Sequence, residues 1–257
     1  MTYDMLRIER LAGGVAVVTL DRPEKRNAMT PGFFRDLPRV LAELDDDPDV
    51  AVCVLTGAGE AFSAGGDIAA FAELHDVRAY RRRLRLVYDA FHAVERAEVP
   101  VVGAINGIAY GGGTELTLAC DLVVAARRAR FAFREPTVGL MPGYGIVRGP
   151  QVIGPAWTRW LALTADPVDA DTALQIGLVQ RVVDDDRVVD EAVAVARRIA
   201  ANAPLGVRLA KQFINRGYAA PGLPESVEAT ALLFTTADHK EAVEAFLAKR
   251  EPRFEGR

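Results

Sequence analysis

The sequence predicts an α/β fold with a mostly parallel sheet that helices cover on both faces. Up to about Ala156, short runs of β-branched residues alternate with longer amphipathic stretches, which is typical of right-handed βαβ units. Beyond that point the apolar pattern is mostly helical. Of the 257 residues, 50% are hydrophobic, so the chain can bury a sizeable core. We therefore expect one main domain followed by a helical appendage.

Each strand is predicted from a short apolar run bounded by turn residues or by a predicted helix. Five segments fit this pattern: Val15–Leu20, Val50–Thr56, Pro100–Ile105, Leu122–Ala126 and Val179–Val183. The main helices are predicted from N-caps, first-turn prolines and apolar periodicity. They run from Thr30 toward Leu44, Asp76 to Glu98, Asp186 to Ala201, Pro204 to Arg216, Pro224 to Thr236 and Asp238 to Lys249. Pro38 should kink or restart the first of them.

The charge balance argues against several classes of partner. The formal net charge is −4, so no overall positive field attracts nucleic acid or a membrane surface. The basic run at residues 81–85 predicts a solvated helix face. No apolar run approaches the roughly 20 residues that span a bilayer. The N-terminal stretch MTYDMLRIER shows no secretory signal, so we expect a cytoplasmic protein.

Metal-binding and nucleophilic side chains are few and scattered. Cys53 and Cys120 lie in apolar runs and are predicted to be buried thiols. His75, His92 and His239 are isolated, without the spacing of a metal site. The chain has two serines and no GxSxG, P-loop, GxGxxG or HExxH motif, which argues against a serine hydrolase and against these nucleotide or zinc sites.

Two glycine-rich segments each lie between a predicted strand and the start of a helix. They are AFSAGGDI at residues 61–68 and INGIAYGGGTEL at residues 105–116. Helix N-termini leave N–H groups without intrahelical partners, and glycine keeps them accessible because it has no Cβ. If the two segments converge, their amides would form an oxyanion hole. The alternative is that the glycines only supply positive φ angles.

Glu115 and Glu135 are the candidate acid–base residues. Between residues 99 and 126 the only charged side chains are Glu115 and Asp121, so Glu115 has no cation nearby in sequence. Glu135 lies in FAFREPTVGLMPGYG. If both carboxyls share one apolar cleft, burial and repulsion raise at least one pKa, and one group could accept a proton while the other donates one. Otherwise Glu135 is a loop residue that pairs with Arg134 or faces water.

These motifs, in this order, resemble the crotonase family, specifically its enoyl-CoA hydratases. The resemblance extends from about Ile8 to Phe254 and rests on LDRPEKRNAM, AVCVLTGAGEAFSAGGDI, PVVGAINGIAYGGGTELTLACDLVVAA, FAFREPTVGLMPGYG and AFLAKR. It implies a crotonase-like spiral of ββα units over residues 1–195. It also implies a C-terminal helical trimerisation region over residues 196–257, with trimers that often pair into hexamers.

The resemblance further implies an acyl-CoA thioester substrate, whose thioester oxygen would be held by the N–H groups of Gly66 and Gly112. Glu115 would position and activate water, and Glu135 would deliver a proton to the α-carbon, so that water adds across the 2,3-double bond. No metal or redox cofactor is implied, because coenzyme A is part of the substrate. The implied coenzyme A contacts are Arg26, Ala28, Ala64, Gly65, Asp67 and Ile68, with Lys249 and Arg250 near its phosphates, either in the same subunit or from a neighbour.

The chain departs from the family pattern around Glu135. Arg134 precedes it where proline is usual, and an inward-facing Arg134 would lower the pKa of Glu135. Tyr144, Ile146 and residues 147–149 replace the usual residues near the acyl pocket. Two other functions stay open. One is another crotonase-type acyl-CoA reaction, first of all Δ3–Δ2 double-bond isomerisation, which can use a single carboxylate. The other is a non-catalytic binding protein, which would need neither carboxylate.

Overall fold

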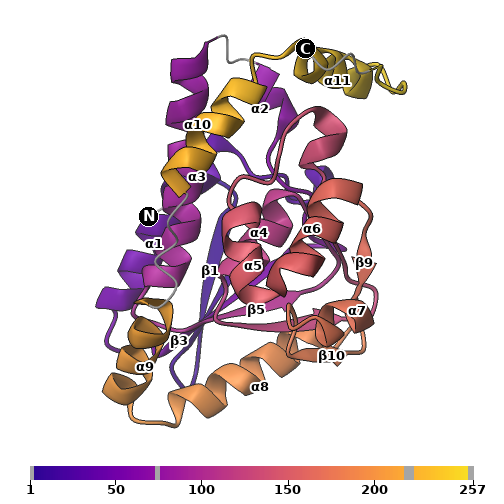
Figure 1. The fold of residues 1–257 in the computed structure, drawn as a ribbon. Helices are drawn as coiled ribbons and strands as arrows, with labels where there is room; N and C mark the ends of the chain where they lie inside the picture. The colour runs from indigo at the N-terminus through magenta and orange to yellow at the C-terminus, as the bar shows by residue number, and fades with distance from the viewer. Residues whose placement is uncertain (1–2, 73–75, 217–222, 254–257) are drawn as a thin grey trace.

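The computed structural model describes residues 3–72, 76–216 and 223–253 (Figure 1). The strands in these ranges are β1 (Leu6–Leu11), β2 (Val15–Leu20), β3 (Val52–Gly57), β4 (Ala61–Ser63), β5 (Val101–Ile105), β6 (Ile108–Tyr110), β7 (Leu122–Ala126), β8 (Arg130–Ala132), β9 (Val168–Asp169) and β10 (Arg181–Val183).

The helices in the same ranges include two short 3-10 turns, η1 (Pro23–Lys25) and η2 (Glu135–Val138). The α-helices are α1 (Pro31–Asp46), α2 (Ile68–Ala72), α3 (Val77–Arg96), α4 (Gly112–Ala119), α5 (Gly145–Val152), α6 (Gly154–Thr164), α7 (Ala170–Gln175), α8 (Val188–Ala200), α9 (Pro204–Arg216), α10 (Leu223–Leu233) and α11 (Ala237–Leu247).

Two sheets form the framework, and three successive pairs of strands each contribute one strand to each sheet. The larger sheet has the order β1-β2-β3-β5-β7-β10, and the smaller has the order β4-β6-β8-β9. The pairs β3–β4, β5–β6 and β7–β8 each place their first strand in the larger sheet and their second in the smaller. The larger sheet is parallel apart from β1, which pairs antiparallel with β2. This repeated crossing between sheets confirms the expected ββα spiral.

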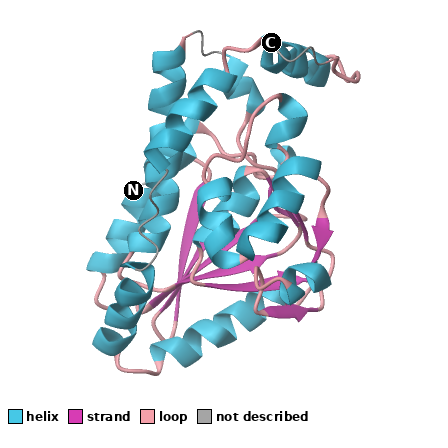
Figure 2. Ribbon diagram, viewed as in Figure 1, coloured by secondary structure: helices cyan, strands magenta, loops and turns pink. Residues whose placement is uncertain are grey.

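Helices cover both faces of the larger sheet, as the sequence predicts (Figure 2). On one face, α8 packs against β3, β5 and β7 through a cluster of valines and alanines, and it runs along the lower side of the sheet in Figure 1. The opposite face contains the main core, to which α1, α3 and α4 contribute. Because both faces are covered, β2 and β3 are mostly apolar, and every residue of each is buried.

The first helix begins as predicted but passes through its proline. Thr30 is the N-cap of α1, and its hydroxyl accepts the N–H of Phe33 at 3.0 Å. The expected restart at Pro38 is wrong, since α1 is one helix from residue 31 to 46. Its buried face holds seven residues on both sides of the proline, and this packing outweighs the single lost hydrogen bond.

Helix α9 attaches to the spiral through a largely buried ion pair. Lys211 of α9 reaches Asp121 at 2.8 Å and also donates to the carbonyls of Val94 and Val99 at 2.9 and 3.0 Å. The sequence offers no neighbouring cation for Asp121, and the fold supplies one from a distant helix. The boundary expected between residues 195 and 196 falls inside α8, which belongs to the sheet packing.

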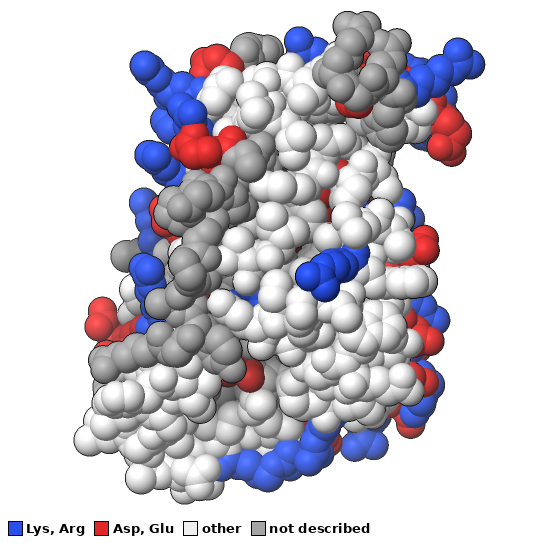
Figure 3. All heavy atoms as spheres, in the orientation of Figure 1, with Lys and Arg blue, Asp and Glu red and all other residues white. Residues whose placement is uncertain are grey.

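Charge and apolar surface are unevenly distributed. In Figure 3 most basic and acidic residues lie along the rim, including the edge where α3 runs. Arg81, Arg82 and Arg85 are exposed on α3, which confirms the predicted solvated face.

Exposed large apolar side chains occur on the later helices, among them Trp160, Leu163, Leu205, Leu209, Ile214, Phe246 and Leu247. Assembly into trimers or hexamers stays a prediction. None of the helices within the described ranges combines the length and apolar character that a membrane crossing requires.

Candidate active site

Glu115 lies in the first turn of α4, two positions after the last glycine of the triplet. The helix begins at Gly112 because Gly111 adopts a φ of +52°, which a residue with a side chain rarely adopts. Glu115 is only 5% exposed. Its Oε1 accepts the backbone N–H groups of Tyr144 and Gly145 at 2.9 and 2.8 Å. These amides start α5, so the buried carboxylate caps a second helix.

Glu135 begins the 3-10 turn η2 and faces the same glycines. A Cβ added to Gly111 would lie 2.9 Å from the Glu135 Oε1 atom, so the triplet leaves room for this carboxyl. The residue as a whole is half-buried, yet its Oε2 is buried and accepts no hydrogen bond from the described residues. The interpretation of Glu135 as a solvent-exposed loop residue is therefore wrong.

Burial raises the pKa of both glutamates, and a neighbouring negative charge raises that of Glu135 as well. Burial raises the pKa of Glu115 to about 7, against the opposing effect of the Gly145 and Tyr144 amides, which favour the charged form. Burial also raises the pKa of Glu135 well above its usual value, and the negative charge of Glu115 raises it further. Such repulsion requires two nearby carboxyls in a poorly solvated space. The pair therefore favours an ionised Glu115 beside a protonated Glu135.

Gly66 and Gly112 come together at the edge of this space. Met29 pairs with Gly66 through the Gly65 carbonyl and the Asp67 N–H, so the intervening Gly66 N–H points away from Met29. A Cβ added to Gly112 would lie 3.7 Å from the Gly66 nitrogen. Two backbone amides, one at a helix start and one in an extended segment, thus lie beside each other, as an oxyanion hole requires.

The two segments expected to contact coenzyme A are adjacent. The Ala64 N–H donates to the Arg26 carbonyl at 2.9 Å, and the Met29 N–H donates to the Gly65 carbonyl at 2.8 Å. Ala28 lies between these bonds in sequence, and Ile68 begins α2. Whether these residues bind coenzyme A stays a prediction.

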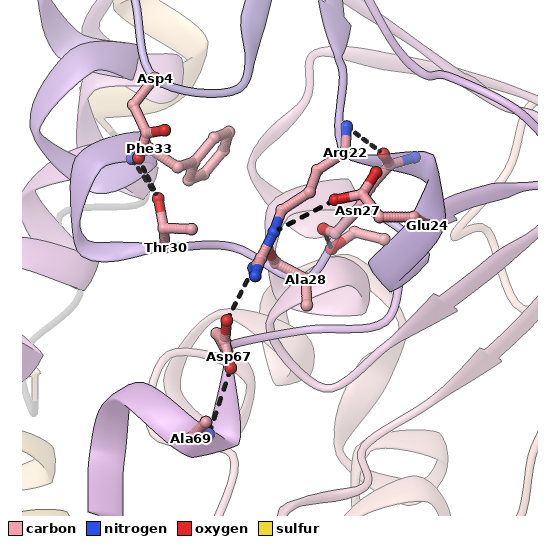
Figure 4. Close-up of polar contacts among 10 residues, drawn as sticks. Asp4, Arg22, Glu24, Asn27, Ala28, Thr30, Phe33, Asp67 and Ala69 are labelled. Atoms are coloured by element: carbon pink, nitrogen blue, oxygen red, sulfur yellow. Dashed lines mark hydrogen bonds and ion pairs between the residues drawn. The ribbon is translucent and has the colours of Figure 1, made fainter. Parts of the chain in front are cut away.

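Arg22 holds these two segments together, a role that the sequence analysis does not predict. Its Nη1 donates to the Ala28 carbonyl at 3.1 Å and to the Asp67 carboxylate at 2.6 Å (Figure 4). The other carboxylate oxygen of Asp67 accepts the Ala69 N–H at 3.1 Å, at the start of α2. Arg22 therefore links the segment before α1 to the residue that directly follows Gly66.

Asn27 is a second such residue. It is fully buried with a φ of +56°, and its side-chain nitrogen donates to the carbonyls of Ala58 and Ala61 at 2.9 and 2.8 Å. Its own carbonyl accepts the Ser63 hydroxyl, which in turn accepts the Gly65 N–H at 3.1 Å. Asparagine is enriched at positive φ, so the asparagine in RNAM is a signal that sequence reading could have used.

Three further residues named from the sequence are Arg134, Lys249 and Arg250. Arg134 turns away from Glu135 and donates to the Ala165 carbonyl at 3.1 Å, so it does not lower the pKa of Glu135. Arg250 forms a two-pronged pair with Glu241 at 2.6 and 2.8 Å, and Lys249 is exposed after α11. Their contact with coenzyme A phosphates stays a prediction.

The isolated cysteines and histidines form no metal site in the part of the chain that the structure describes. Cys53 is a buried free thiol and Cys120 is half-buried, close to expectation. His92 packs edge-on against Tyr144 with ring centroids 5.9 Å apart, and His239 is buried. His75 lies outside the described residues.

Comparison with known proteins identifies the family of the chain. The chain matches the family model described as enoyl-CoA hydratase/isomerase over residues 10–257. It is 38% identical over 244 residues to the short-chain-enoyl-CoA hydratase of Clostridium acetobutylicum, which covers 93% of each chain. It is 37% identical over 259 residues to the crotonyl-CoA hydratase of Syntrophomonas wolfei, which covers 99% of each.

Solved structures show the same fold. An enoyl-CoA hydratase/isomerase from Xanthobacter autotrophicus Py2 matches with a TM-score of 0.88 and 30% identity, over 99% of this chain and 100% of that one. An enoyl-CoA hydratase from Mycobacterium avium subsp. paratuberculosis matches with a TM-score of 0.87 and 26% identity, again over 99% and 100%. On its sequence and its ββα spiral, the chain belongs to the enoyl-CoA hydratase/isomerase family.

Proposed function

We propose that the protein is an enoyl-CoA hydratase that adds water across the 2,3-double bond of a 2-enoyl-CoA. The observation that carries this proposal is that two neighbouring glutamate carboxyls differ in their hydrogen-bond partners. Glu115 has two amide donors that favour its charged form, whereas the Oε2 atom of Glu135 has none. Hydration needs one base and one acid at the same time, and this pair supplies both.

In the proposed reaction, the thioester oxygen accepts the N–H groups of Gly66 and Gly112. Ionised Glu115 takes a proton from water as the water oxygen bonds to C3 of the substrate. The π electrons of the double bond move toward the thioester, and the amides stabilise the negative oxygen that results. Protonated Glu135 then gives its proton to C2. Exchange of a proton with solvent restores both carboxyls, and the reverse sequence dehydrates a 3-hydroxyacyl-CoA.

The names of the relatives support a short acyl chain, since one is called a short-chain-enoyl-CoA hydratase and another a crotonyl-CoA hydratase. Crotonyl-CoA is therefore the first substrate to test. The proposed reaction uses no metal or redox cofactor, because the base, the acid and the oxyanion donors all come from the chain.

The test is an assay of wild type, Glu115→Gln and Glu135→Gln with crotonyl-CoA and with a 3-enoyl-CoA. Each substitution should lower kcat for hydration by at least about 100-fold, in line with the usual contribution of general acid–base groups. Glu9→Gln, at an exposed position on β1, is the matched control and should retain wild-type turnover. Turnover of the 3-enoyl-CoA without hydration of crotonyl-CoA would instead identify an isomerase. No turnover of either by wild type would favour a binding protein.

A further inference from the structure

The C-terminal helix α11 contacts the turn that carries Glu135. His239, in the first turn of α11, is only 5% exposed, and its Nδ1 lies 2.7 Å from the Val138 carbonyl oxygen. Val138 is the last residue of η2, the turn that Glu135 begins. A residue 101 positions away in sequence from that carbonyl therefore holds the far end of the turn.

The remaining hydrogen bonds of the turn are internal. The Arg134 carbonyl accepts the Thr137 N–H at 3.1 Å, the Pro136 carbonyl accepts the Gly139 N–H at 3.2 Å, and the Glu135 carbonyl accepts the Leu140 N–H at 2.9 Å. The Val138 carbonyl instead finds its donor in α11. His239 therefore completes the hydrogen bonding of η2.

The backbone of α11 also packs directly on the turn. Gly139 ends η2 with a φ of +73°, and an added Cβ there would lie 2.8 Å from the Cα of His239. The imidazole packs edge-on against Phe234 at 4.8 Å, and Phe234 stacks on Tyr80 of α3 at 4.2 Å. The Thr236 hydroxyl accepts the His239 N–H at 3.1 Å and caps the helix. Contacts with Gly139, Phe234 and Thr236 thus fix the position of His239.

The direction of the bond follows from the chemistry of its two atoms. A carbonyl oxygen only accepts, so Nδ1 of His239 carries the hydrogen and donates it. Burial lowers the pKa of His239, which keeps the ring neutral at pH 7 with its hydrogen on Nδ1.

The carboxyl of Glu135 depends on this turn for its direction. Its Oε2 accepts no hydrogen bond from the described residues, and Arg134 points elsewhere. The backbone N–H of Glu135 itself binds the carboxyl, so the backbone of η2 sets where the carboxyl points. A small rotation of the turn would move the acid relative to the carbon that it protonates, and displacements of about 1 Å can cost about 100-fold in rate.

We propose that His239 is a positioning residue, which fixes the turn η2 through its bond to Val138 and its contact with Gly139 and so aims the Glu135 carboxyl at the reacting carbon. This inference rests on the proposed hydratase function, because it assigns Glu135 the role of acid. It gives α11 a part in the chemistry, although α11 itself carries none of the reacting groups.

The experiment compares His239→Leu, which has a similar size but no donor, with His239→Asn, whose side-chain nitrogen can occupy the place of Nδ1. Crotonyl-CoA hydration gives kcat and KM. Hydrogen–deuterium exchange of a peptide covering residues 135–140 reports the turn itself, with residues 112–119 of α4 as the internal reference.

We expect His239→Leu to lower kcat about 10- to 100-fold, with KM within about twofold and faster exchange of the turn but not of α4. His239→Asn should recover most of both effects. Unchanged exchange of the turn in His239→Leu would overturn the inference, as would unchanged kcat, or an Asn variant as impaired as the Leu variant. Failure of the proposed function would look different, since wild type would then not hydrate crotonyl-CoA or Glu135→Gln would remain active. The exchange measurement decides the role of His239 in the turn in that case too.

Discussion

The Glu115 carboxylate accepts the Gly145 N–H at 2.8 Å, at the first residue of α5. Two amides and the partial positive charge of a helix N-terminus thus stabilise the anion of a buried acid. Burial and the charge of Glu115 favour the neutral form of Glu135, against one opposing hydrogen bond from its own backbone N–H. The difference in pKa between the two acids therefore arises from α5, whose first amides bind Glu115 and not Glu135.

The first prediction concerns the pH dependence of the rate. As the pH rises, Glu115 loses its proton first, with a pKa of about 7, whereas Glu135 stays protonated to higher pH. kcat for crotonyl-CoA hydration should rise through about pH 7 and fall at higher pH, when Glu135 ionises. A profile from pH 5 to 10 measures both limbs. A rate that falls steadily from pH 5 upward would contradict this assignment.

The second prediction concerns stability. In the unfolded chain Glu115 ionises near its usual pKa of 4.5, and in the folded protein near about 7. Between these values the folded state binds more protons, so the free energy of unfolding of wild type falls as the pH rises. At about 1.4 kcal/mol for each pKa unit, the loss reaches about 3 kcal/mol. It is absent below pH 4.5 and complete above about pH 7.

Glu115→Gln removes this titration, and its side-chain oxygen can still accept the Tyr144 and Gly145 amides. The stability of the variant relative to wild type should therefore increase by about 3 kcal/mol between pH 4.5 and pH 8. Urea unfolding at several pH values measures the difference. If the difference in unfolding free energy between variant and wild type does not change with pH, the fold does not destabilise the charged form of Glu115.

The third prediction concerns the space beside the backbone amides of Gly66 and Gly112. In Gly112→Ala the new methyl group would lie 3.7 Å from the Gly66 nitrogen, where it competes with the thioester oxygen for space. It also lies 2.8 Å from the end of the flexible Met29 side chain, which can move aside. We expect kcat to fall about 100-fold, comparable to loss of one oxyanion donor, with nearly unchanged urea unfolding. Gly206→Ala, in open space on α9, is the control and should keep full activity.

The sequence predicts the local features of this site well. Strand–glycine–helix junctions depend on neighbouring residues, and both appear where expected, with α4 beginning inside the glycine triplet. The burial of Glu115 follows from an apolar segment without cations. The strands β1, β4, β6, β8 and β9 are not predicted. The last four have only two or three residues and so show no alternation, whereas β1 carries three charged, exposed residues among its six.

The contacts that orient the site could not be predicted in the same way. Arg22 reaches Asp67 across 45 residues, Gly145 reaches Glu115 across 30, and His239 reaches Val138 across 101. No periodicity or cap rule encodes such pairs, since they depend on how the spiral brings distant segments together. Conversely, closeness in sequence does not guarantee contact. Arg134 is adjacent to Glu135 in the chain, but its side chain donates to the Ala165 carbonyl.

The fourth prediction concerns the link between Arg22 and Asp67. Arg22→Gln and Asp67→Asn should each lower kcat about 10-fold, because a loosened segment misplaces the Gly66 N–H. The side chains are 24% and 21% exposed, so the pair itself contributes only about 1 kcal/mol to stability. The double variant should be little worse than either single one. Arg39→Gln, on the exposed surface of α1, is the control. A loss confined to KM would instead favour direct contact with coenzyme A.

The last prediction concerns the buried pair that anchors α9. Lys211→Met leaves the Asp121 carboxylate buried without its cation, which should cost about 3 to 5 kcal/mol of unfolding free energy. Burial already raises the pKa of Asp121 and Lys211 opposes that rise, so the loss should be smaller at low pH, where Asp121 is protonated. Adding Asp121→Asn removes the uncompensated charge and keeps an acceptor for the Val101 N–H, which Asp121 now binds at 2.7 Å. The double variant should therefore be more stable than Lys211→Met in urea unfolding at pH 8. Equal stability of the two variants would mean that the ammonium acts through the Val94 and Val99 carbonyls alone, and that the ion pair does not fasten α9.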